Sequence, residues 1–280
     1  MIRPAAMAGT WYPATPAVLL QDLEGYLGAA GEGPSGRVDA VIVPHAGLMF
    51  SGAVGAWAFK AAARHPYDVV VLVGPSHHVG FSGVALWPEG AFASPLGDVV
   101  IDPDGANAML RSSVVRSMPS AHEREHSLEM QVPFVARLLP GVPIVPLLMG
   151  AQRRETIEAL AEALTAGFAA RRALLVASTD LSHFFDAETA ATLDGRVQDA
   201  VARFDPEGLL GIFEHYPEHE RGRYVACGGG PAISVLLAAR ALGARDGRVL
   251  KYAHSGDVSG DHSCVVGYLA AAFGTFDDAD

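Results

Sequence analysis

Three short apolar runs in this chain each end in a turn that carries histidine. The runs DAVIVP, DVVVLVG and ALLVAS lead into PHAG at His45, GPSHH at His77 and His78, and STDLSH at His183. Short continuous apolar runs are typical of parallel strands that are buried on both faces. Since ligands bind outside the carboxyl ends of such strands, we expect these imidazoles to meet at one edge of a sheet. The sequence therefore predicts a metal or proton-transfer site there.

Strand and helix patterns alternate along the rest of the chain. Strands are predicted at 39–44, 68–73, 143–148, 173–177, 248–253 and 264–270, with edge strands or a hairpin near 83–86 and 98–101. Helices are predicted from Pro16, and at 52–64, 103–115, 127–138, 153–170, 187–203 and 230–242. Strand–helix–strand units of this kind form a parallel sheet through right-handed crossovers. With no internal repeat or long linker, residues 1–280 are expected to form one α/β domain, with a largely parallel or mixed central sheet flanked by helices.

Charge and composition exclude several classes of partner. The formal net charge is −11, so a phosphate backbone would be repelled over most of the surface, and we expect no nucleic-acid partner. The opening MIRPAAMAGTWYPATP lacks the apolar stretch of a signal peptide. No segment reaches the roughly 18 uninterrupted apolar residues of a membrane span. Two cysteines are too few for a disulfide framework, so we expect a cytoplasmic protein with no membrane partner.

The two cysteines are expected to differ in environment. Cys264 stands in the apolar run SCVVGYLAAAF, which predicts a buried thiol. Cys227 begins the turn CGGGP, just before a predicted helix. Because the N-terminus of a helix lowers the pKa of a nearby thiol, Cys227 is the predicted reactive or metal-binding cysteine. A phosphate cradle is a less favoured interpretation of this turn, since the lysine and hydroxyl of a P-loop are missing.

The turn STDLSH places a carboxylate and an imidazole three residues apart. Asp180 is well suited to orient His183 as a general base or to tune its pKa. The alternative is that Asp180 or Ser182 simply caps the helix that follows.

Four further histidines are expected to stay outside the metal site. Neighbouring side chains in an extended segment point to opposite sides, so only one histidine of the pair His77 and His78 is expected to reach it. The polar surroundings of His65, His215 and His219 predict surface positions.

The string HEREH at 122–126 matches the zinc metalloprotease pattern H-E-x-x-H. That pattern needs two imidazoles one turn apart on a buried helix and a third ligand downstream. Here the neighbours are polar and no such extension follows, which favours a loop. A zinc hydrolase built on His122 and His126 is kept as an alternative.

Taken together, the motifs resemble those of the Memo family, the B component of AmmeMemoRadiSam systems. The ordered set comprises GTWYP, PHAG, GPSHH, EHSLEMQVPF, STDLSHF, CGGGP and VVGYLAAAF, between residue 8 and about residue 273. The family is similar in fold to the catalytic subunit of class III extradiol dioxygenases, which hold non-haem Fe(II) with two histidines and one glutamate. The resemblance also implies functional association with radical-SAM and AMMECR-type proteins.

The resemblance implies a set of site residues, which stand at the motif positions that match the family. The implied metal ligands are His45, His77 and Cys227. The implied pocket residues are Asp180 and His183, together with Glu125, His126, Glu129 and Met130 of the EHSLEM element. Of these, His183, Asp180 and His126 are the candidate catalytic residues.

The ligand set departs from that of the dioxygenases, because a thiolate replaces the carboxylate. Two imidazoles and a thiolate suit Fe(II), copper or zinc. The leading hypothesis is an iron-dependent oxidoreductase that acts on an unidentified small molecule or peptide, with His183 as acid or base and Asp180 orienting it. The alternative from another class is a non-catalytic module that binds a peptide or metabolite in the same cleft.

Overall fold

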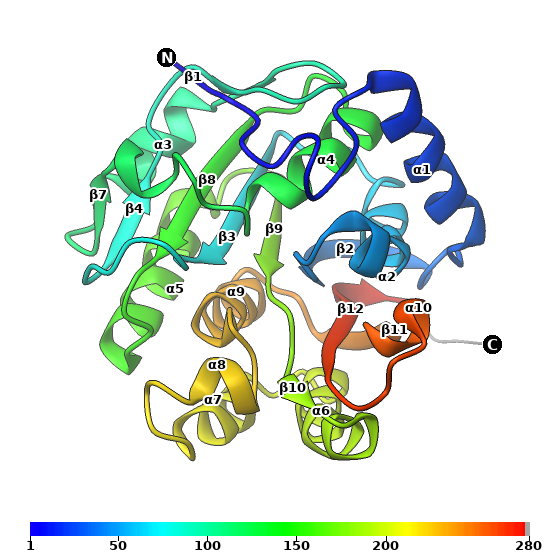
Figure 1. The fold of residues 1–280 in the computed structure, drawn as a ribbon. Coiled ribbons are helices and arrows are strands. Elements are labelled where there is room, and N and C mark those ends of the chain that lie inside the picture. The colour runs from blue at the N-terminus through cyan, green and yellow to red at the C-terminus, as the bar shows by residue number, and fades with distance from the viewer. Residues whose placement is uncertain (278–280) are drawn as a thin grey trace.

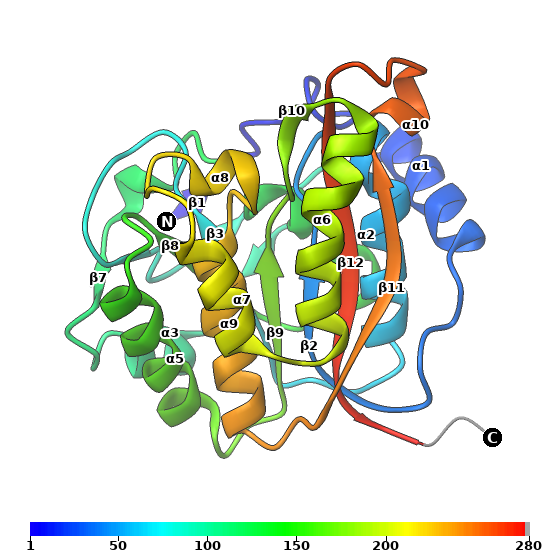
Figure 2. The same ribbon diagram turned by 90° about the horizontal axis from the view of Figure 1, so that it is seen from below.

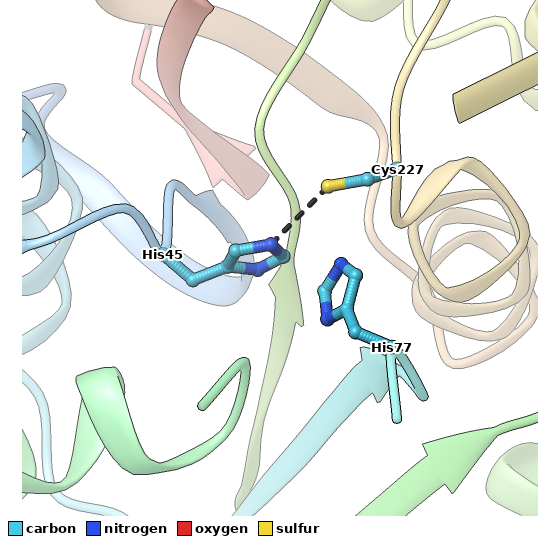
Figure 3. A group of neighbouring side chains, drawn as sticks. All are labelled: His45, His77 and Cys227. Carbon is cyan, nitrogen blue, oxygen red and sulfur yellow. Dashed lines mark hydrogen bonds between the residues drawn. The ribbon is translucent and has the colours of Figure 1, made fainter. Parts of the chain in front are cut away.

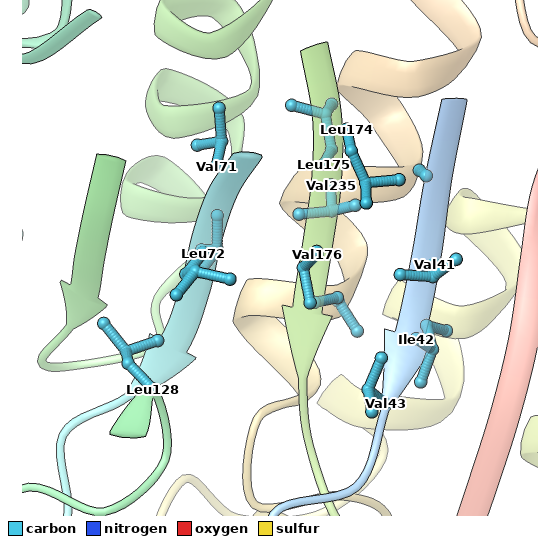
Figure 4. Close-up of a cluster of buried hydrophobic side chains, with 14 of the residues drawn as sticks. Val41, Ile42, Val43, Val71, Leu72, Leu128, Leu174, Leu175, Val176 and Val235 are labelled. Carbon is cyan, nitrogen blue, oxygen red and sulfur yellow. The ribbon is translucent and has the colours of Figure 1, made fainter. Parts of the chain in front are cut away.

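Four parallel strands form the centre of the fold. The computed structural model describes residues 1–277. In it, β2 (Gly36–Val43), β9 (Ala173–Ser178), β3 (Val69–Pro75) and β8 (Ile144–Met149) lie side by side in that order, all parallel. Every residue of β3 and β8 is buried, which explains why these strands read as unbroken apolar runs. Figure 4 shows apolar side chains of β2, β3 and β9 that make up this core.

Antiparallel strands extend the sheet at both sides. Beside β2, β12 (Val265–Phe276) pairs antiparallel and also carries β11 (Asp246–His254) and β10 (His183–Phe185). Beside β8, β4 (Val84–Leu86) pairs antiparallel and continues to β7 (Val115–Ser117). The result is a mixed sheet with a parallel centre, and this confirms the predicted α/β architecture.

The two short segments predicted as edge strands or a hairpin have separate positions. Because β4 is paired on both sides, it lies inside the sheet and is no edge strand. The segment near 98–101 contains β6 (Val99–Val100), which pairs with β5 (Ala91–Phe92) in a small second sheet. The N-terminal β1 (Ile2–Arg3) completes that sheet parallel to β5, so the hairpin prediction was wrong for these two segments.

Helices cover both faces of the large sheet. They are α1 (Pro16–Ala29), α2 (Leu48–Ala62), α3 (Pro103–Met109), α4 (Val132–Leu138), α5 (Arg154–Phe168), α6 (Ala187–Ala202), α7 (Pro206–Glu214), α8 (Arg221–Tyr224), α9 (Gly229–Ala241) and α10 (Gly256–Ser259). On one face α2 packs against β2 and β12, with α1 outside it, and on the other α9 packs beneath β2, β9 and β3 beside α5 and α7 (Figures 1 and 2). Among the described residues, no helix has the length and apolar character that crossing a bilayer requires.

Three helix predictions differ from the structure for identifiable reasons. The helix predicted at 103–115 ends at Met109, because Val115 pairs with β4 in the sheet. The helix predicted from 127 is α-helical only from Val132, after a 3₁₀ turn, and Pro133 lies in its first turn, where proline is tolerated. The helix α7 was missed, although Asp205 caps it and Pro206 opens it, which is a recognisable start signal.

Candidate metal centre

The adjacent carboxyl ends of β2, β9 and β3 bring residues from distant parts of the chain together. His45 follows the end of β2 by two residues, and His77 follows the end of β3 by two. Cys227 comes from the other face, just before α9, which packs beneath these strands. The donor atoms of the three side chains all lie within 4.8 Å of one another (Figure 3).

His45 is held in one tautomer by its neighbours. Its Nδ1 lies 2.9 Å from the Ser178 hydroxyl, whose own proton is donated to the Ser127 carbonyl at 2.6 Å. The Ser178 oxygen must therefore accept from Nδ1–H, which leaves Nε2 as the basic nitrogen. That Nε2 lies 3.2 Å from the Cys227 sulfur. Burial and the neighbouring imidazoles lower the pKa of His45 well below its usual value, so the ring is neutral, as a metal ligand requires.

His77 is oriented by the buried carboxylate of Glu125. The backbone N–H of His77 donates to Glu125 Oε2 at 2.6 Å, and the imidazole Nδ1 of His77 lies 2.8 Å from Glu125 Oε1. Burial opposes the charged imidazole, but the neighbouring Cys227 sulfur and Glu125 carboxylate outweigh it and raise the pKa of His77 to about 10. A metal ion must displace that proton, and Nε2 is the nitrogen left to bind it. Carboxylate–histidine pairs of this kind orient the ligands of many metal sites.

A second group of potential ligands consists of His77, Glu125 and His126. Both oxygens of Glu125 are already engaged, because Oε1 also accepts from the backbone N–H groups of His126 and Ser127 at 3.0 Å. Burial raises the pKa of Glu125, but these hydrogen bonds and His77 outweigh it and lower the value to about 2. Glu125 therefore supports His77 and is poorly placed to bind a metal itself. The sequence placed Glu125 in the pocket loop without this role.

The contacts of Glu125 lead to a testable expectation. In Glu125→Gln the amide NH₂ must face at least one of the N–H donors that now point at the carboxylate, which disturbs the orientation of His77. Metal affinity measured by competition with a chelator is expected to fall by about 10- to 100-fold. The neighbouring exposed residue provides the control, Glu123→Gln, with unchanged affinity. Equal affinity in both variants would show that His77 needs no carboxylate.

Cys227 is half-buried and is tied to the Asp180 backbone. The amide of Asp180 lies 3.4 Å from the Cys227 sulfur, and the Cys227 N–H donates to the Asp180 carbonyl at 3.2 Å. The glycines that follow allow close packing: a Cβ on Gly228 would lie 2.4 Å from the Ser178 carbonyl, and one on Gly229 2.3 Å from the Phe213 ring. Packing therefore accounts for these two glycines of the CGGGP turn without a phosphate.

Asp180 and His183 interact differently from the expectation. The Asp180 carboxylate accepts from the N–H groups of His45 and Ala46, at 2.7 and 3.3 Å. His183 Nδ1 lies 2.7 Å from the Leu181 carbonyl, which can only accept, so Nδ1 carries the proton and Nε2 is the basic nitrogen. Among the hydrogen bonds of residues 1–277, the Leu181 carbonyl orients the His183 ring, and the Asp180 carboxylate binds the backbone of His45 and Ala46. Burial raises the pKa of Asp180, and its electrostatic attraction to His183 opposes that effect.

The capping alternative for this turn is wrong. The helix that follows is α6, and the side chain that caps it is Asp186, which accepts from the Thr189 N–H at 2.9 Å. Asp180 and Ser182 are therefore free of that role.

The three predicted turns open into one cavity of about 480 Å³. His45, His77 and His183 all line it, which confirms that they meet at one sheet edge, and so do Asp180 and His126. The other walls are largely apolar and include Trp11, Met49, Phe50, Phe184 and Tyr268. Burial lowers the pKa of His126 to about 4, so its ring is neutral where it stacks on His77, with centroids 4.4 Å apart. Phe184 is 63% exposed and has a φ of 65°, an uncommon backbone conformation for a bulky residue.

The zinc-hydrolase alternative fails on geometry. Residues 122–126 form turns and irregular structure, so the two imidazoles do not lie on one helix. His122 is buried, its Nε2 lies 3.1 Å from the Ala85 carbonyl, and it is not among the residues that line the cavity. Neither group of potential metal ligands in residues 1–277 includes His122.

Other predictions about single residues had mixed outcomes. His215 and His219 are exposed as expected, but His65 is only half exposed. Cys264 is exposed, so the prediction of a buried thiol was wrong. The reason is that β12 begins at Val265, which leaves Cys264 in the loop before the strand. His78 lies outside the group formed by His45, His77 and Cys227.

The N-terminal segment contributes a wall that the sequence did not predict. Trp11 packs on His126, with ring centroids 4.4 Å apart, and its carbonyl accepts from the Leu48 N–H at 3.0 Å. Buried Arg3 and Glu129 hold this segment in place through an ion pair of 2.7 Å. A charged residue in the first strand and a glutamate at the start of a 3₁₀ turn give no local sign of such a contact.

This chain is similar to known proteins over nearly its whole length. The model of the family described as Memo-like protein matches residues 3–272. A MEMO1 family protein of Methanopyrus kandleri is 36% identical, covering 98% of this chain and 99% of that protein. Another, from Methanothermobacter thermautotrophicus, is also 36% identical, over 96% of this chain and 99% of that protein. A crystal structure of an uncharacterized Escherichia coli K12 protein shares the fold, with a TM-score of 0.56 and 12% identity over 85% of this chain and 100% of that one.

Proposed function

This chain belongs to the Memo-like protein family, and we propose that it is a metal-dependent oxidoreductase whose metal is held by His45, His77 and Cys227. One observation carries the proposal: three donor atoms of the right chemistry lie within 4.8 Å of one another, and the two histidines among them line a cavity large enough for a small substrate. Two imidazoles and a thiolate fit Fe(II), and also copper or zinc. We propose Fe(II) because the family resembles in fold the extradiol dioxygenases, which hold non-haem Fe(II).

The orientation of the two histidines also fits a metal. Each histidine has its Nδ1 committed to a neighbour, Ser178 for His45 and Glu125 for His77, so both offer the same nitrogen, Nε2. When bound, the metal supplies electron transfer or polarises a substrate oxygen. The chain itself supplies the cavity, the fixed orientation of the ligands, and groups that move protons.

His183 is the proposed acid or base. Its Nδ1 is fixed as the proton-bearing nitrogen by the Leu181 carbonyl, so Nε2 is the atom that takes up or releases a proton in the cavity. Asp180 positions the site by holding the backbone of His45 and Ala46. His126 keeps a neutral ring in the wall, where it contacts substrate.

Replacement of His183 separates proton transfer from metal binding. His183→Ala is expected to lower turnover by about 10²-fold, the lower range for lost general acid–base catalysis, with bound iron unchanged. Turnover and iron content are measured on the same anaerobic preparation. Loss of iron in this variant would instead make His183 a ligand.

The proposal as a whole is tested by metal analysis and O₂ consumption. Protein purified anaerobically and loaded with Fe(II) is expected to hold one iron per chain and to consume O₂ in the presence of candidate substrates such as aromatic diols. One bound iron without any turnover would favour the non-catalytic module that binds a metabolite or peptide. Absence of stoichiometric iron, copper and zinc would refute the metal site.

Location and partners belong to the proposal too. We propose a cytoplasmic location because two cysteines are too few for a disulfide framework. The functional association with radical-SAM and AMMECR-type proteins is proposed from the family resemblance.

A further inference from the structure

A second hollow lies next to the metal cavity and shares a wall with it. Trp11 and His126 line both the 480 Å³ cavity and a neighbouring hollow of about 300 Å³. Their rings are 4.4 Å apart and tilted by 39°. The same two side chains border both spaces, so the second hollow lies directly beside the cavity that His45 and His77 line.

The second hollow favours negative charge. Its remaining walls are Ala6, Met7, His78 and Arg124, and no carboxylate is among its lining residues in the described chain. The guanidinium of Arg124 is exposed and takes part in none of the ion pairs formed among residues 1–277. An arginine without a carboxylate partner in the lining therefore makes the hollow locally cationic, although the protein as a whole carries a net charge of −11.

The walls of the hollow are held in place by buried groups. The N–H groups of Ala6 and Met7 donate to the Glu129 carboxylate at 3.0 and 2.7 Å. Arg3 donates to the carbonyls of His122 and Glu125, on either side of Arg124, at 2.7 and 2.6 Å. The N-terminal segment and the loop that carries Arg124 are thus fixed relative to each other. A binding site ordered in advance loses less entropy when a ligand enters.

The residues on the two sides of the shared wall differ in chemistry. On the metal side Met49, Phe50 and Phe184 offer apolar surface. On the other side Arg124 offers a planar group of donors that matches a carboxylate or phosphate, with His78 beside it.

We propose that the substrate of the metal site is a small organic anion. Its carboxylate or phosphate group binds Arg124 and His78, and its apolar body lies across Trp11 and His126 into the cavity. This assigns a role to the second histidine of the GPSHH motif, which the metal site leaves unused. The inference rests on the proposed function only for the reacting end of the substrate.

Binding of three small probes tests the subsite without any turnover. Phenyl phosphate, benzoate and neutral benzyl alcohol are titrated calorimetrically into the protein, both loaded with Fe(II) under anaerobic conditions and without added iron. At least one anion is expected to bind ten times more tightly than the alcohol. Arg124→Gln is expected to remove that tenfold difference, and His78→Gln to reduce it. The matched control is Arg111→Gln, an exposed arginine outside both hollows, with wild-type affinity.

The outcomes separate the subsite from the metal proposal. If phenyl phosphate binds more tightly than benzoate through Arg124, the substrate is a phosphate ester, and the reverse order identifies a carboxylic acid. Anion binding that depends on Arg124, in protein that takes up no iron, copper or zinc, supports the subsite and contradicts the metal site. If the protein takes up iron but anion binding is unchanged in Arg124→Gln, the result supports the metal site and contradicts the anion subsite. Failure of both anions to bind wild-type protein, or equal binding of the alcohol, overturns the inference.

Discussion

Cys227→Ser is expected to abolish stoichiometric iron binding. The Cys227 sulfur is the only soft donor among the three side chains that converge, and it lies 3.2 Å from His45 Nε2. A serine hydroxyl in the same place stays protonated at neutral pH and is a poor ligand for Fe(II), copper or zinc. The loss of affinity should exceed the 10- to 100-fold that is typical for removal of a supporting residue around a metal site. Iron per chain after anaerobic loading, and competition with a chelator, measure it.

The exposed thiol of Cys264 must be controlled for when Cys227 is tested as a metal ligand. Because Cys264 is accessible, a thiol reagent modifies it as well, and alkylation is informative only in a Cys264→Ser background. In that background, blocking Cys227 should prevent iron uptake, whereas Cys264→Ser alone should bind iron like the wild type. Full iron content in Cys227→Ser would remove the sulfur from the ligand set.

Arg3→Met is expected to lower the free energy of unfolding by about 3–5 kcal/mol, the range for breaking a buried ion pair by removal of one partner. Arg3 and Glu129 are 1% and 0% exposed, and their charges compensate each other inside the protein. The variant leaves the Glu129 carboxylate with hydrogen bonds from Ala6, Met7 and Tyr12 but without a cation. Equilibrium unfolding in urea measures the difference.

Two further variants show whether burial of the Arg3–Glu129 pair causes the expected loss of stability in Arg3→Met. Arg37→Met removes one partner of a pair at the surface, in which Arg37 is 58% and Asp39 22% exposed, and should cost clearly less than Arg3→Met. Arg3→Lys keeps the charge but cannot reproduce the forked contacts to His122 and Glu129, so it should fall between wild type and Arg3→Met. Equal effects of Arg3→Met and Arg37→Met would mean that the buried pair contributes no more than a surface pair.

Local sequence patterns were sufficient for the parts of the site that follow directly from strands. His45 and His77 stand two residues beyond strands that end in continuous apolar runs, and strand ends of this kind can be recognised without knowing the partners. The three motif strands are neighbours in the order β2, β9, β3, so their ends share one cavity.

Contacts that depend on the path of loops could not be predicted. The hydrogen bond from His183 goes to the Leu181 carbonyl and not to Asp180, where the backbone of Leu181 and Ser182 pairs with Gly267 of β12. Cys264 is exposed because β12 starts one residue later. In both cases the deciding fact is where a strand pairs, which composition does not reveal.

The sequence by itself determined the α/β class, the parallel core and the motifs that mark the family, because these depend on local periodicity and on turns that follow strands. Only the tertiary structure decided which groups support the metal ligands. Glu125 meets His77 from 48 residues away, and Arg3 meets Glu129 from 126 residues away. Such contacts form because buried charged groups must find partners wherever the fold brings them, and no local pattern encodes that place.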